Sequence, residues 1–509
     1  MKKTRLITLL SLIPMMALSS CSKSAPHYEV DKIAFDKSNL TQESFGGLGV
    51  EWGVYEDIDK LAENGWERII KNMDHLAPSR VRVMVSYDWF VTDFDNKGNT
   101  DKSDDTWNYN FSTKTALNLF DILEYCQIHD IDVAFGAWNV VADLAYDVWG
   151  MMEDVTSDIR WAKITGEILN FLVKDKGFTC IKWFVNSNEP NYAGYEGQSK
   201  NYNNTYEKWQ QGVKNVRKTL DSYGLNWIGI VGGDTTGVEG TREYLTNIAK
   251  NMPESVGDYG CHLYINNFLI DRGGLYTEVK KIYNEIQSID KGLGKIRFAN
   301  IWESGLLDGK NNATDCQAFI TSHIYGVRMG DYTLQCIAAG INGIVYWDFD
   351  DGMHFMYTNN TQTPKEWGMF SSLASATPKK QELRPWYHSS CLLTHLLKEG
   401  NKIYSPGQND PTLGEEFQSF RSIGTVSPDG KHGGFAAVNA DTKSTTKTFY
   451  LDEKVEGDKL YIYYFNESSL KLDEEGWIIP NDVISGSLNK KLTIQIPSKT
   501  MVVVSNEEL

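Results

Sequence analysis

Residues 180–190 read Cys-Ile-Lys-Trp-Phe-Val-Asn-Ser-Asn-Glu-Pro, and residues 296–305 read Ile-Arg-Phe-Ala-Asn-Ile-Trp-Glu-Ser-Gly. Each stretch is a short, mostly apolar run that ends in polar residues, a pattern typical of a strand buried on both faces. Each also carries a glutamate near its end, Glu189 in the first and Glu303 in the second. The two stretches therefore predict two buried strands, each presenting a carboxylate at its carboxyl end.

Similar runs recur along the chain and predict eight strands, at Phe45–Trp52, Arg80–Ser86, Ile131–Ala137, Cys180–Asn186, Trp227–Val231, Asp258–Leu263, Ile296–Trp302 and Gly343–Trp347. Helical periodicity fills most of the intervals, for example at Thr113–Ile128, Asp158–Lys174, Tyr206–Tyr223, Leu275–Ile286 and Ala318–Ala339. Alternation of strand and helix implies an α/β protein with parallel strands. Eight such units over roughly 350 residues favour a closed (β/α)₈ TIM barrel over an open doubly wound sheet.

Two polar or glycine-rich segments lie next to the first strands. Gly46-Gly47-Leu48-Gly49 lies inside the first expected strand. A phosphate-binding loop would follow its strand and open directly into a helix, so we interpret this segment as a tight entry into the strand. The stretch Asp93–Asp105 follows the second strand, and we expect it to be a long loop at the barrel mouth.

The pattern changes near residue 400. A helix at Trp386–Lys398 is expected to close the barrel, and from about Gln418 the chain has short alternating strands with Asp-Gly and Asn-bearing turns, at Gly434–Val438, Thr446–Leu451, Leu460–Phe465, Leu492–Ile496 and Met501–Val504. This pattern predicts a C-terminal β-sandwich. We therefore expect a linker with an N-terminal strand at 21–40, the barrel at 41–400 and the sandwich at 401–509. The strand candidate Tyr28–Phe35 is a possible further member of the sandwich.

The first twenty residues have the features of an export signal. Lys2, Lys3 and Arg5 precede an apolar run that leads to Leu18-Ser19-Ser20-Cys21. This end resembles a bacterial lipobox, in which cleavage before the cysteine precedes its lipidation. The alternative is an ordinary secretory signal with a chance cysteine. The lipobox implies an exported protein whose Cys21 anchors it to a bacterial membrane, at the outer membrane, the cell surface or a periplasmic face. No later stretch is expected to span a membrane.

Composition restricts the partners of this chain. It has 509 residues, 41% of them hydrophobic, and a formal net charge of −17. Nucleic acid is an improbable partner, because phosphate binding requires a basic face. The 15 Trp and 26 Tyr fit a large core and also fit platforms for sugar rings. The six cysteines after Cys21 show no metal-ligand spacing, so neither a zinc site nor a redox motif is supported.

The two glutamates suggest a chemistry. Active sites of such barrels lie at the carboxyl ends of the strands, so Glu189 and Glu303 are expected on opposite walls of one mouth. Cleavage of a glycosidic bond needs two carboxyl groups, one that holds a proton for the leaving oxygen and one that stays ionised. The spacing therefore favours a glycosidase.

The strand ends resemble those of glycoside hydrolase clan A. Asn188-Glu189-Pro190 is similar to the clan's fourth-strand motif, and Trp302-Glu303-Ser304 is similar to its seventh-strand nucleophile. The resemblance covers about residues 45–400 and includes families thirty, thirty-nine and five, among which the motifs do not choose. It implies that Glu189 is the acid/base, that Glu303 is the nucleophile and that Asn188 binds the 2-hydroxyl of the sugar.

The same resemblance implies roles for other strand ends. Arg82 would position the nucleophile, with Arg80 as the competing candidate. His262 and Tyr264 match the clan's His-x-Tyr, in which the tyrosine donates to the nucleophile and the histidine lines the site. Trp347 would form the floor of the sugar subsite, and Trp138 and Asn139, after the third strand, would contact the sugar. Glu51, Trp52 and Asp234 also lie near strand ends and are weaker candidates.

The predicted function is hydrolysis of β-glycosidic bonds in an oligo- or polysaccharide, with net retention by double displacement. The carbohydrate substrate is the only partner expected besides the membrane anchor, and no metal or organic cofactor is implied. Two alternatives remain open, a non-catalytic surface glycan-binding protein on the same barrel and a transglycosylase. The sugar and the linkage have no readable signal in the strand-end motifs.

Overall fold

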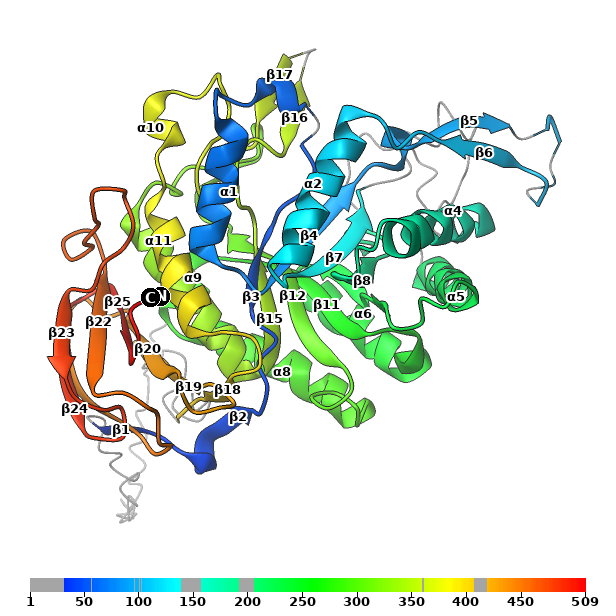
Figure 1. The fold of residues 1–509 in the computed structure, drawn as a ribbon. Helices are drawn as coiled ribbons and strands as arrows, with labels where there is room; N and C mark the ends of the chain where they lie inside the picture. Colours follow the sequence, from blue (N-terminus) through cyan, green and yellow to red (C-terminus); the bar gives the residue numbers. More distant parts are fainter. Residues whose placement is uncertain are drawn as a thin grey trace, which may run out of the picture.

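The computed structural model describes residues 32–509 except 56, 96, 100, 102, 139–156, 192–205, 359–360 and 407–418. Figure 1 shows a barrel with its helices on one side of the molecule and a β-sandwich on the other. The predicted signal segment with Cys21 lies outside the described residues, and so does Asn139.

The barrel strands form one parallel sheet in the order β10-β11-β12-β15-β3-β4-β7-β8-β9. In chain order they are β3 (Leu48–Glu51), β4 (Arg80–Val85), β7 (Asp132–Ala137), β8 (Ile181–Val185), β9 (Gly229–Ile230), β10 (Gly233–Thr236), β11 (Asp258–Ile265), β12 (Phe298–Leu306) and β15 (Ile341–Tyr346). The two ends of this order, β9 and β10, are separated in sequence only by Val231 and Gly232. The sheet therefore closes on itself, and the predicted TIM barrel is confirmed.

The fifth barrel strand differs from its prediction. Trp227–Val231 was expected as one strand, and instead β9 pairs with β8 while β10 pairs with β11. The break falls at two glycines. Gly233 has a φ of 115°, which other residues rarely adopt, and a Cβ on Gly232 would lie 2.2 Å from the carbonyl oxygen of Asp258. The strand is therefore interrupted after β9, and the next strand of the barrel, β10, begins at Gly233.

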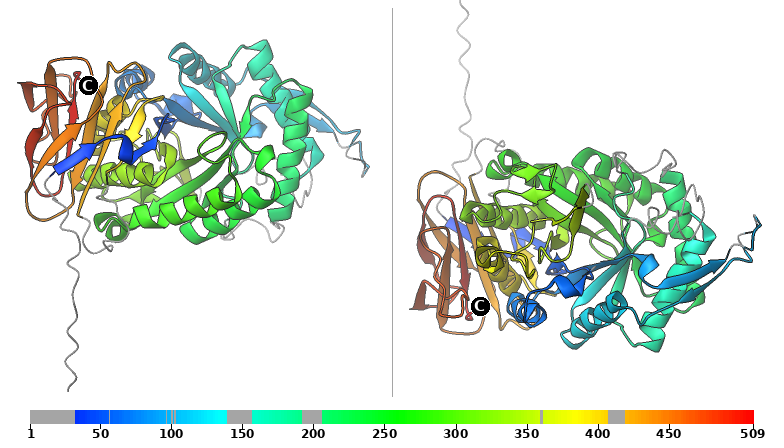
Figure 2. Two further views of the ribbon diagram at one scale, coloured as in Figure 1. Left: turned by 90° about the horizontal axis from the view of Figure 1, so that it is seen from below. Right: turned by 90° about the horizontal axis from the view of Figure 1, so that it is seen from above.

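Helices surround the barrel (Figures 1 and 2). They are α1 (Gly65–Leu76), α2 (Lys114–Ile128), α4 (Ile159–Asn170), α5 (Tyr206–Ser222), α6 (Val238–Asn251), α7 (Asn267–Asp271), α8 (Gly274–Ile289), α9 (His323–Ala339), α10 (Pro378–Gln381) and α11 (Pro385–Leu396). The segment Phe171–Asp175 extends α4 as a π-helix, and short 3₁₀ turns lie at Lys37–Asn39, Ile58–Lys60, Tyr87–Trp89 and Pro253–Ser255. The α9 helix begins five residues later than its prediction, at His323, because Ala318–Ser322 form turns.

Alternation along β4 separates the two cores of the barrel. Val81, Val83 and Val85 belong to the large cluster that also contains the helices, whereas Met84 belongs to a small cluster inside the barrel. Successive side chains of a strand point to opposite faces, so Arg82 shares the inner face with Met84. The inner cluster is completed by side chains of the other strands: Ala134, Val185, Val231, Trp302 and Val345.

The sandwich consists of two sheets. The larger has the order β2-β18-β19-β20-β25-β22-β23 and the smaller β1-β21-β24. Their bounds are β1 (Lys32–Phe35), β2 (Leu40–Gln42), β18 (Lys402–Tyr404), β19 (Phe420–Val426), β20 (Gly433–Asn439), β21 (Thr445–Leu451), β22 (Lys459–Phe465), β23 (Asp482–Ser485), β24 (Leu492–Ile496) and β25 (Thr500–Ser505). Two of these strands, β1 and β2, come from the N-terminal side of the barrel, so the expected boundary at residue 41 falls inside β2.

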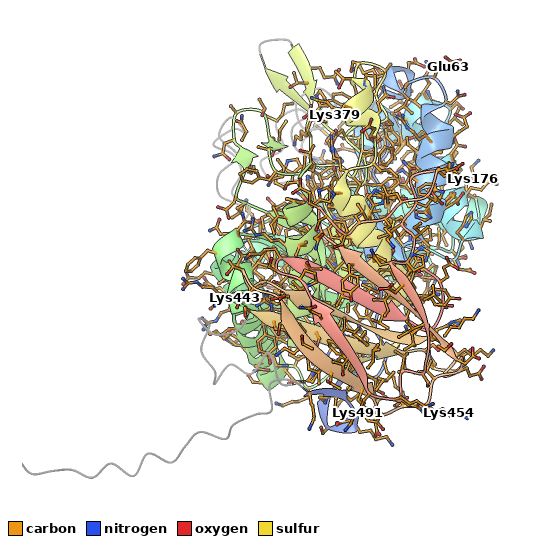
Figure 3. All side chains as sticks on the ribbon, turned by 90° about the vertical axis from the view of Figure 1, so that its left-hand side faces the viewer. Glu63, Lys176, Lys379, Lys443, Lys454 and Lys491 are labelled. Carbon is orange, nitrogen blue, oxygen red and sulfur yellow. The ribbon has the colours of Figure 1, made fainter. Side chains whose placement is uncertain are left out.

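The central strands of the larger sheet, β19, β20 and β25, are buried on both faces. On β25, Val502 and Val504 face the smaller sheet, whereas Met501 and Val503 pack into the cluster of the barrel helices. Both faces of the sheet therefore exclude water at these central strands, and the sandwich is continuous with the barrel through α9 and α11 (Figure 1). Charged side chains lie instead at the periphery of the sandwich, where Lys443, Lys454 and Lys491 extend outward (Figure 3).

The expectation of a plain loop at Asp93–Asp105 is wrong at its start, because Asp93–Asp95 belong to β5. The chain forms a hairpin of β5 (Val91–Asp95) and β6 (Thr106–Tyr109) that extends away from the barrel (Figures 1 and 2). Alternating aromatic residues explain the strands, since Phe94 and Trp107 stack across the pair at 6.4 Å between ring centroids. Two smaller hairpins follow later barrel strands: β13 (Lys310–Asn311) with β14 (Cys316–Gln317), and β16 (Phe355–Thr358) with β17 (Thr361–Pro364).

The six cysteines after Cys21 all lie among the described residues. Cys126, Cys180, Cys261, Cys336 and Cys391 are buried free thiols, and Cys316 is a partly exposed one. Among the described residues, no helix has both the length and the apolar character needed to cross a membrane.

A buried ion pair joins the sandwich to the barrel. Arg421 of β19 donates through Nε to Oδ1 of Asp331 on α9 at 2.7 Å, and through Nη2 to the carbonyl oxygen of Ile270 at 3.1 Å. Asp331 also accepts from Gln335 Nε2 at 2.9 Å. Neither charged side chain is exposed by more than 2%, so each charge depends on the other.

We expect Arg421→Ala to lower the free energy of unfolding by about 3–5 kcal/mol, because it leaves Asp331 buried without its cation. The double change Arg421→Met with Asp331→Leu is expected to recover most of this loss. Lys71→Ala, which removes an exposed pair with Glu475, serves as the control and should cost less than about 1 kcal/mol. Denaturant unfolding measures all three, and equal losses for Arg421→Ala and Lys71→Ala would contradict the role of burial.

Candidate active site

Arg82 lies at the centre of a cluster of acceptors. Its Nη1 donates to Glu51 Oε2 at 3.0 Å and to Glu303 Oε1 at 2.8 Å. Its Nη2 donates to Asn188 Oδ1 at 2.7 Å and to Asp234 Oδ2 at 2.9 Å. Burial alone would lower the pKa of Arg82, but the attraction of the surrounding carboxyl groups outweighs it and raises the pKa further. One guanidinium therefore holds four strand ends together.

A bulge in β12 turns Glu303 into the barrel. Cys261 pairs with Ile301, but the next residue, His262, pairs with Glu303, so Trp302 is the extra residue of the longer strand. Trp302 lies in the inner cluster, and simple alternation would place Glu303 outside. Because an inserted residue re-aims the side chains that follow it, Trp302 and Glu303 both face the interior.

A second bulge places Asp234. Gly233 pairs with Gly260 and Thr235 with Cys261, which leaves Asp234 as the unpaired residue. Its φ is 54°, and its carbonyl oxygen accepts from the backbone N–H of Glu189, whose φ is 44°, at 3.0 Å. Positive φ is unfavourable for both residue types, and such strain tends to occur at functional sites. The two strand ends therefore fix each other's backbone.

His262 connects three carboxyl groups. Its Nδ1 lies 3.0 Å from Glu189 Oε1 and 3.3 Å from Glu303 Oε2, and its Nε2 lies 2.9 Å from Asp234 Oδ1. Burial would lower its pKa, but Asp234 and Glu303 dominate and raise the pKa to about 10. The ring is thus an imidazolium at neutral pH, and both of its N–H groups donate to carboxyl oxygens.

The carboxyl groups respond differently to these cations. Burial would raise the pKa of Glu189, yet the hydrogen bond and charge of His262 outweigh it, so the pKa is lowered. The pKa of Glu303 is raised, because burial and the charges of Glu189 and Asp234 exceed the attraction of His262 and Arg82. Burial also opposes ionisation of Asp234, but Arg82 and His262 lower its pKa. Asp234 is therefore the carboxyl group of the cluster that both cations keep ionised.

Tyr264 completes the surroundings of Glu303. Its hydroxyl donates to Glu303 Oε2 at 2.8 Å. Burial, followed by the charge of Glu303, keeps the pKa of Tyr264 well above its ordinary value, so the hydroxyl remains a donor. The ring meets Trp367 edge to face at 5.7 Å between centroids, which restricts the direction in which the hydroxyl can point.

Three aromatic rings lie beside the charged cluster. Trp138 at the end of β7 and Trp347 after β15 meet edge to face at 5.9 Å. His354 stacks on Trp347 at 4.7 Å with 14° between the planes, and meets Trp138 edge on at 4.8 Å. The guanidinium carbon of Arg82 lies 5.5 Å from the centroid of Trp138. The predicted sugar floor is thus adjacent to the charged cluster, with His354 as a further member.

The competing and weaker candidates separate clearly. Arg80 lies two residues before Arg82 on β4, where its Nη1 donates to Asn300 Oδ1 at 3.2 Å. Arg82 is therefore the arginine of the cluster. Glu51 and Asp234 belong to the cluster, whereas Trp52 is completely buried among the rings of Trp66, Tyr125 and Phe349. Trp52 is therefore a core residue.

Sequence reasoning underestimated Asp234 and missed His354. Asp234 follows the predicted end of its strand, and the signal that could have revealed it is the preceding pair Gly232-Gly233, which marks a bulge. His354 lies eight residues beyond the end of β15 at Tyr346. Residues so far from a strand end are placed by loop geometry, which no local pattern reports.

Glu189, His262 and Glu303 each offer one ligand atom within 4.8 Å of the others, a spacing that could hold a metal ion. The pKa of His262 is raised to about 10, whereas an imidazole that binds a metal is neutral, so a metal ion would have to displace this proton. The histidine cation itself thus supplies positive charge between the two carboxyl groups. We interpret the trio as an ion-paired acid cluster.

Comparisons with known proteins support the fold. No protein-family model and no curated protein sequence matches the chain. Among solved structures, a glycoside hydrolase family 30 subfamily 8 xylanase from Clostridium acetobutylicum is similar at a TM-score of 0.59 and 12% identity, over 93% of this chain and 99% of that one. A monomeric β-xylosidase from Caulobacter crescentus gives 0.59 and 12% over 94% and 100%. An α-L-arabinofuranosidase from Thermotoga maritima gives 0.56 and 11% over 94% and 100%.

The His262 cation makes a prediction about stability. A pKa raised from 6.5 to about 10 means that its stabilising contribution is fully present below about pH 6.5 and is lost as pH rises toward about pH 10. We expect His262→Gln to remove this component of the pH dependence of unfolding. His388→Gln is the matched control, because burial lowers the pKa of His388 to about 4 and its ring stays neutral throughout this range. If the free energy of unfolding of His262→Gln depended on pH as steeply as that of wild type, the assignment of His262 as a cation would be contradicted.

Proposed function

We propose that this protein is a retaining glycoside hydrolase that cleaves β-glycosidic bonds of an oligo- or polysaccharide. The observation that carries the proposal is the spacing of its two carboxyl groups, since an oxygen of Glu189 and an oxygen of Glu303 lie within 4.8 Å of each other. Retaining enzymes hold their carboxyl groups about 5–5.5 Å apart, whereas inverting enzymes need about 6.5–9.5 Å to admit a water. The short spacing supports double displacement.

Glu303 is the nucleophile in this proposal. Arg82 and Tyr264 each donate to it at 2.8 Å, and the His262 imidazolium lies 3.3 Å away as a counter-charge. They favour the ionised carboxylate and fix the direction of its oxygens toward the anomeric carbon. The attack forms a bond from Glu303 to the sugar as the bond to the leaving oxygen breaks.

Glu189 is the acid/base. Its Oε1 faces the His262 imidazolium at 3.0 Å, which keeps it ionised in the free site. Burial is the largest single influence on its pKa, and a bound sugar excludes more water. Substrate binding therefore moves the pKa upward, toward the protonated form that a general acid needs. After the leaving group departs, the Glu189 carboxylate takes a proton from the water that releases the sugar from Glu303.

The remaining residues bind the sugar. The Oδ1 of Asn188 is held by Arg82 at 2.7 Å, so its amide N–H groups are the atoms that can donate to the 2-hydroxyl. Trp347 and Trp138 provide apolar surface for the ring, and His354 stacks on Trp347. The structural relatives are named as a xylanase, a β-xylosidase and an α-L-arabinofuranosidase, which supports hydrolysis of an O-glycosyl bond.

On activated aryl β-glycosides we expect Glu303→Gln to lower kcat/KM by about 10³-fold or more, because it removes the nucleophile. We expect Glu189→Gln to lower kcat by about 10²–10⁴-fold, because it removes the general base that releases the sugar from Glu303. Proton NMR of the first-formed product should show the same anomeric configuration as the substrate. Glu303→Gln should still bind the sugar. Azide should restore turnover to Glu189→Ala with a retained glycosyl azide as product, since azide needs no general base.

The matched control is Glu453→Gln, which changes a carboxylate of the sandwich that binds Lys402 at 2.9 Å and should retain activity. An inverted product would contradict double displacement. Sugar binding without turnover in the wild type, across a panel of aryl glycosides and polysaccharides, would favour the glycan-binding alternative. Transfer products formed at low acceptor concentration would favour the transglycosylase.

We further propose that Cys21 anchors the mature protein to a bacterial membrane through lipid. The support is the basic start, the apolar run and the small residues before Cys21. We expect Cys21→Ser to abolish incorporation of labelled palmitate and to shift the protein from the membrane to the soluble fraction or leave it unprocessed. A Ser20→Ala variant keeps a small residue before the cysteine and is the control. Unchanged membrane association of Cys21→Ser, with no label in the wild type, would contradict the anchor.

A further inference from the structure

Glu51, at the end of β3, is a buried carboxyl group that the double-displacement mechanism does not use. Its side chain is 0% exposed, and its Oε2 accepts from Arg82 Nη1 at 3.0 Å. Among the described residues, its Oε1 is buried and has no hydrogen-bond partner. A carboxylate in this position would leave one charged oxygen without water and without a donor, which is costly.

Glu303 shares the same Arg82 nitrogen but has a different set of donors. It accepts from Arg82 and from Tyr264, and it also forms an ion pair with His262, whereas Glu51 accepts from Arg82 alone. When two carboxyl groups compete for one cation, the group with fewer donors takes the proton. The hydrogen-bond pattern therefore makes Glu51 the neutral member of the pair.

We propose that Glu51 is a positioning residue, a neutral carboxylic acid that orients Arg82 while leaving its positive charge to Glu303 and Asp234. This inference rests on the proposed function, because Glu303 is taken to be the nucleophile. Glu51 touches neither the sugar nor the reacting atoms in this view. It acts through the guanidinium of Arg82. The carboxylic acid accepts a hydrogen bond from Nη1 and adds no further negative charge.

The surrounding charges agree with a neutral Glu51. Among the described residues, Arg82 on β4 is the cation that faces it, and Glu303 on β12, Asp234 on β10 and Asp348 after β15 face it as acids. Burial is the largest influence, and with the neighbouring acids it raises the pKa of Glu51 to about 8 despite the attraction of Arg82. Burial also raises the pKa of Asp348 well above its ordinary value, so the pKa values of both acids shift in the same direction.

A charge count explains why neutrality matters. Arg82 and His262 supply two positive charges to Asp234, Glu189 and Glu303. Ionisation of Glu51 would add a further anion that competes for Arg82 Nη1, which lies 2.8 Å from the nucleophile. We therefore expect activity to fall as pH rises through about 8, the pKa of Glu51, because Arg82 is drawn from Glu303 to Glu51.

The test is the pH profile of kcat/KM for Glu51→Gln, which accepts from Arg82 but cannot ionise. The substrate is an activated aryl β-glycoside, whose leaving group does not need a proton from Glu189. We expect its kcat/KM at about pH 6.5 to stay within about threefold of wild type, and its alkaline limb to move upward by about one pH unit. Glu51→Ala, which leaves Arg82 unsupported, should lose about tenfold or more at every pH. An alkaline limb of Glu51→Gln that coincides with that of wild type would overturn the proposal, and so would a loss as large as that of Glu51→Ala.

The control is Asp258→Asn, a second buried carboxyl group whose pKa burial raises to about 6. Asp258 lies at the start of β11 and accepts from Trp302 Nε1 at 2.8 Å. Its replacement tests whether any change in a buried acid of the barrel moves the profile. The alkaline limb should stay at its wild-type position in this variant, and a shift equal to that of Glu51→Gln would count against a specific role for Glu51.

Unfolding measurements separate this inference from the proposed function. Because the pKa of Glu51 is raised from 4.5 to about 8 in the folded protein, its contribution to stability is lost as pH rises from about 4.5 to about 8. Glu51→Gln should therefore gain stability relative to wild type across this range, whether or not a substrate is known. If no glycoside is turned over but this gain is seen, the proposed function fails and the neutral Glu51 stands. Parallel stability curves would overturn the neutral Glu51.

Discussion

The Arg82 guanidinium is the interaction on which the geometry of this site depends. It is a rigid, planar donor with fixed N–H directions, and four strand ends converge on its two terminal nitrogens. A lysine could supply the charge but not the fork that holds Glu303 and Asn188 at defined positions. Because Arg82 is fully buried, its charge must be matched by carboxyl groups, and this requirement brings Glu303 and Asp234 together.

His262 is the second cation, and its place follows from the first. Asp234 accepts from Arg82 through Oδ2 and from His262 through Oδ1, so one buried aspartate links the two positive groups. The imidazolium then lies between Glu189 and Glu303, whose mutual repulsion it reduces. The short distance between the proposed acid/base and the proposed nucleophile is therefore stabilised by a proton held on His262.

Much of this arrangement could be predicted from the chain itself. Strand ends at Asn188-Glu189, His262-x-Tyr264 and Glu303 carried the resemblance to clan A, and the structure brings these residues together around Arg82. The sandwich could also be predicted, since side chains alternate between two faces along its strands. The boundary at residue 41 was misplaced because β2 is short and pairs with β18, a strand more than 300 residues later in the chain.

The sequence by itself determined the eight-unit alternation of strands and helices, and with it the carboxyl-terminal mouth at which both glutamates lie. The hydrophobic period and the residue types at strand ends are local properties, so they can be identified in a single sequence. Only the tertiary structure decided that Trp302 and Asp234 occupy bulges, that His354 stacks on Trp347, and that Glu51 competes with Glu303 for one nitrogen. These features depend on register between neighbouring strands and on shared burial, which arise only when distant segments meet.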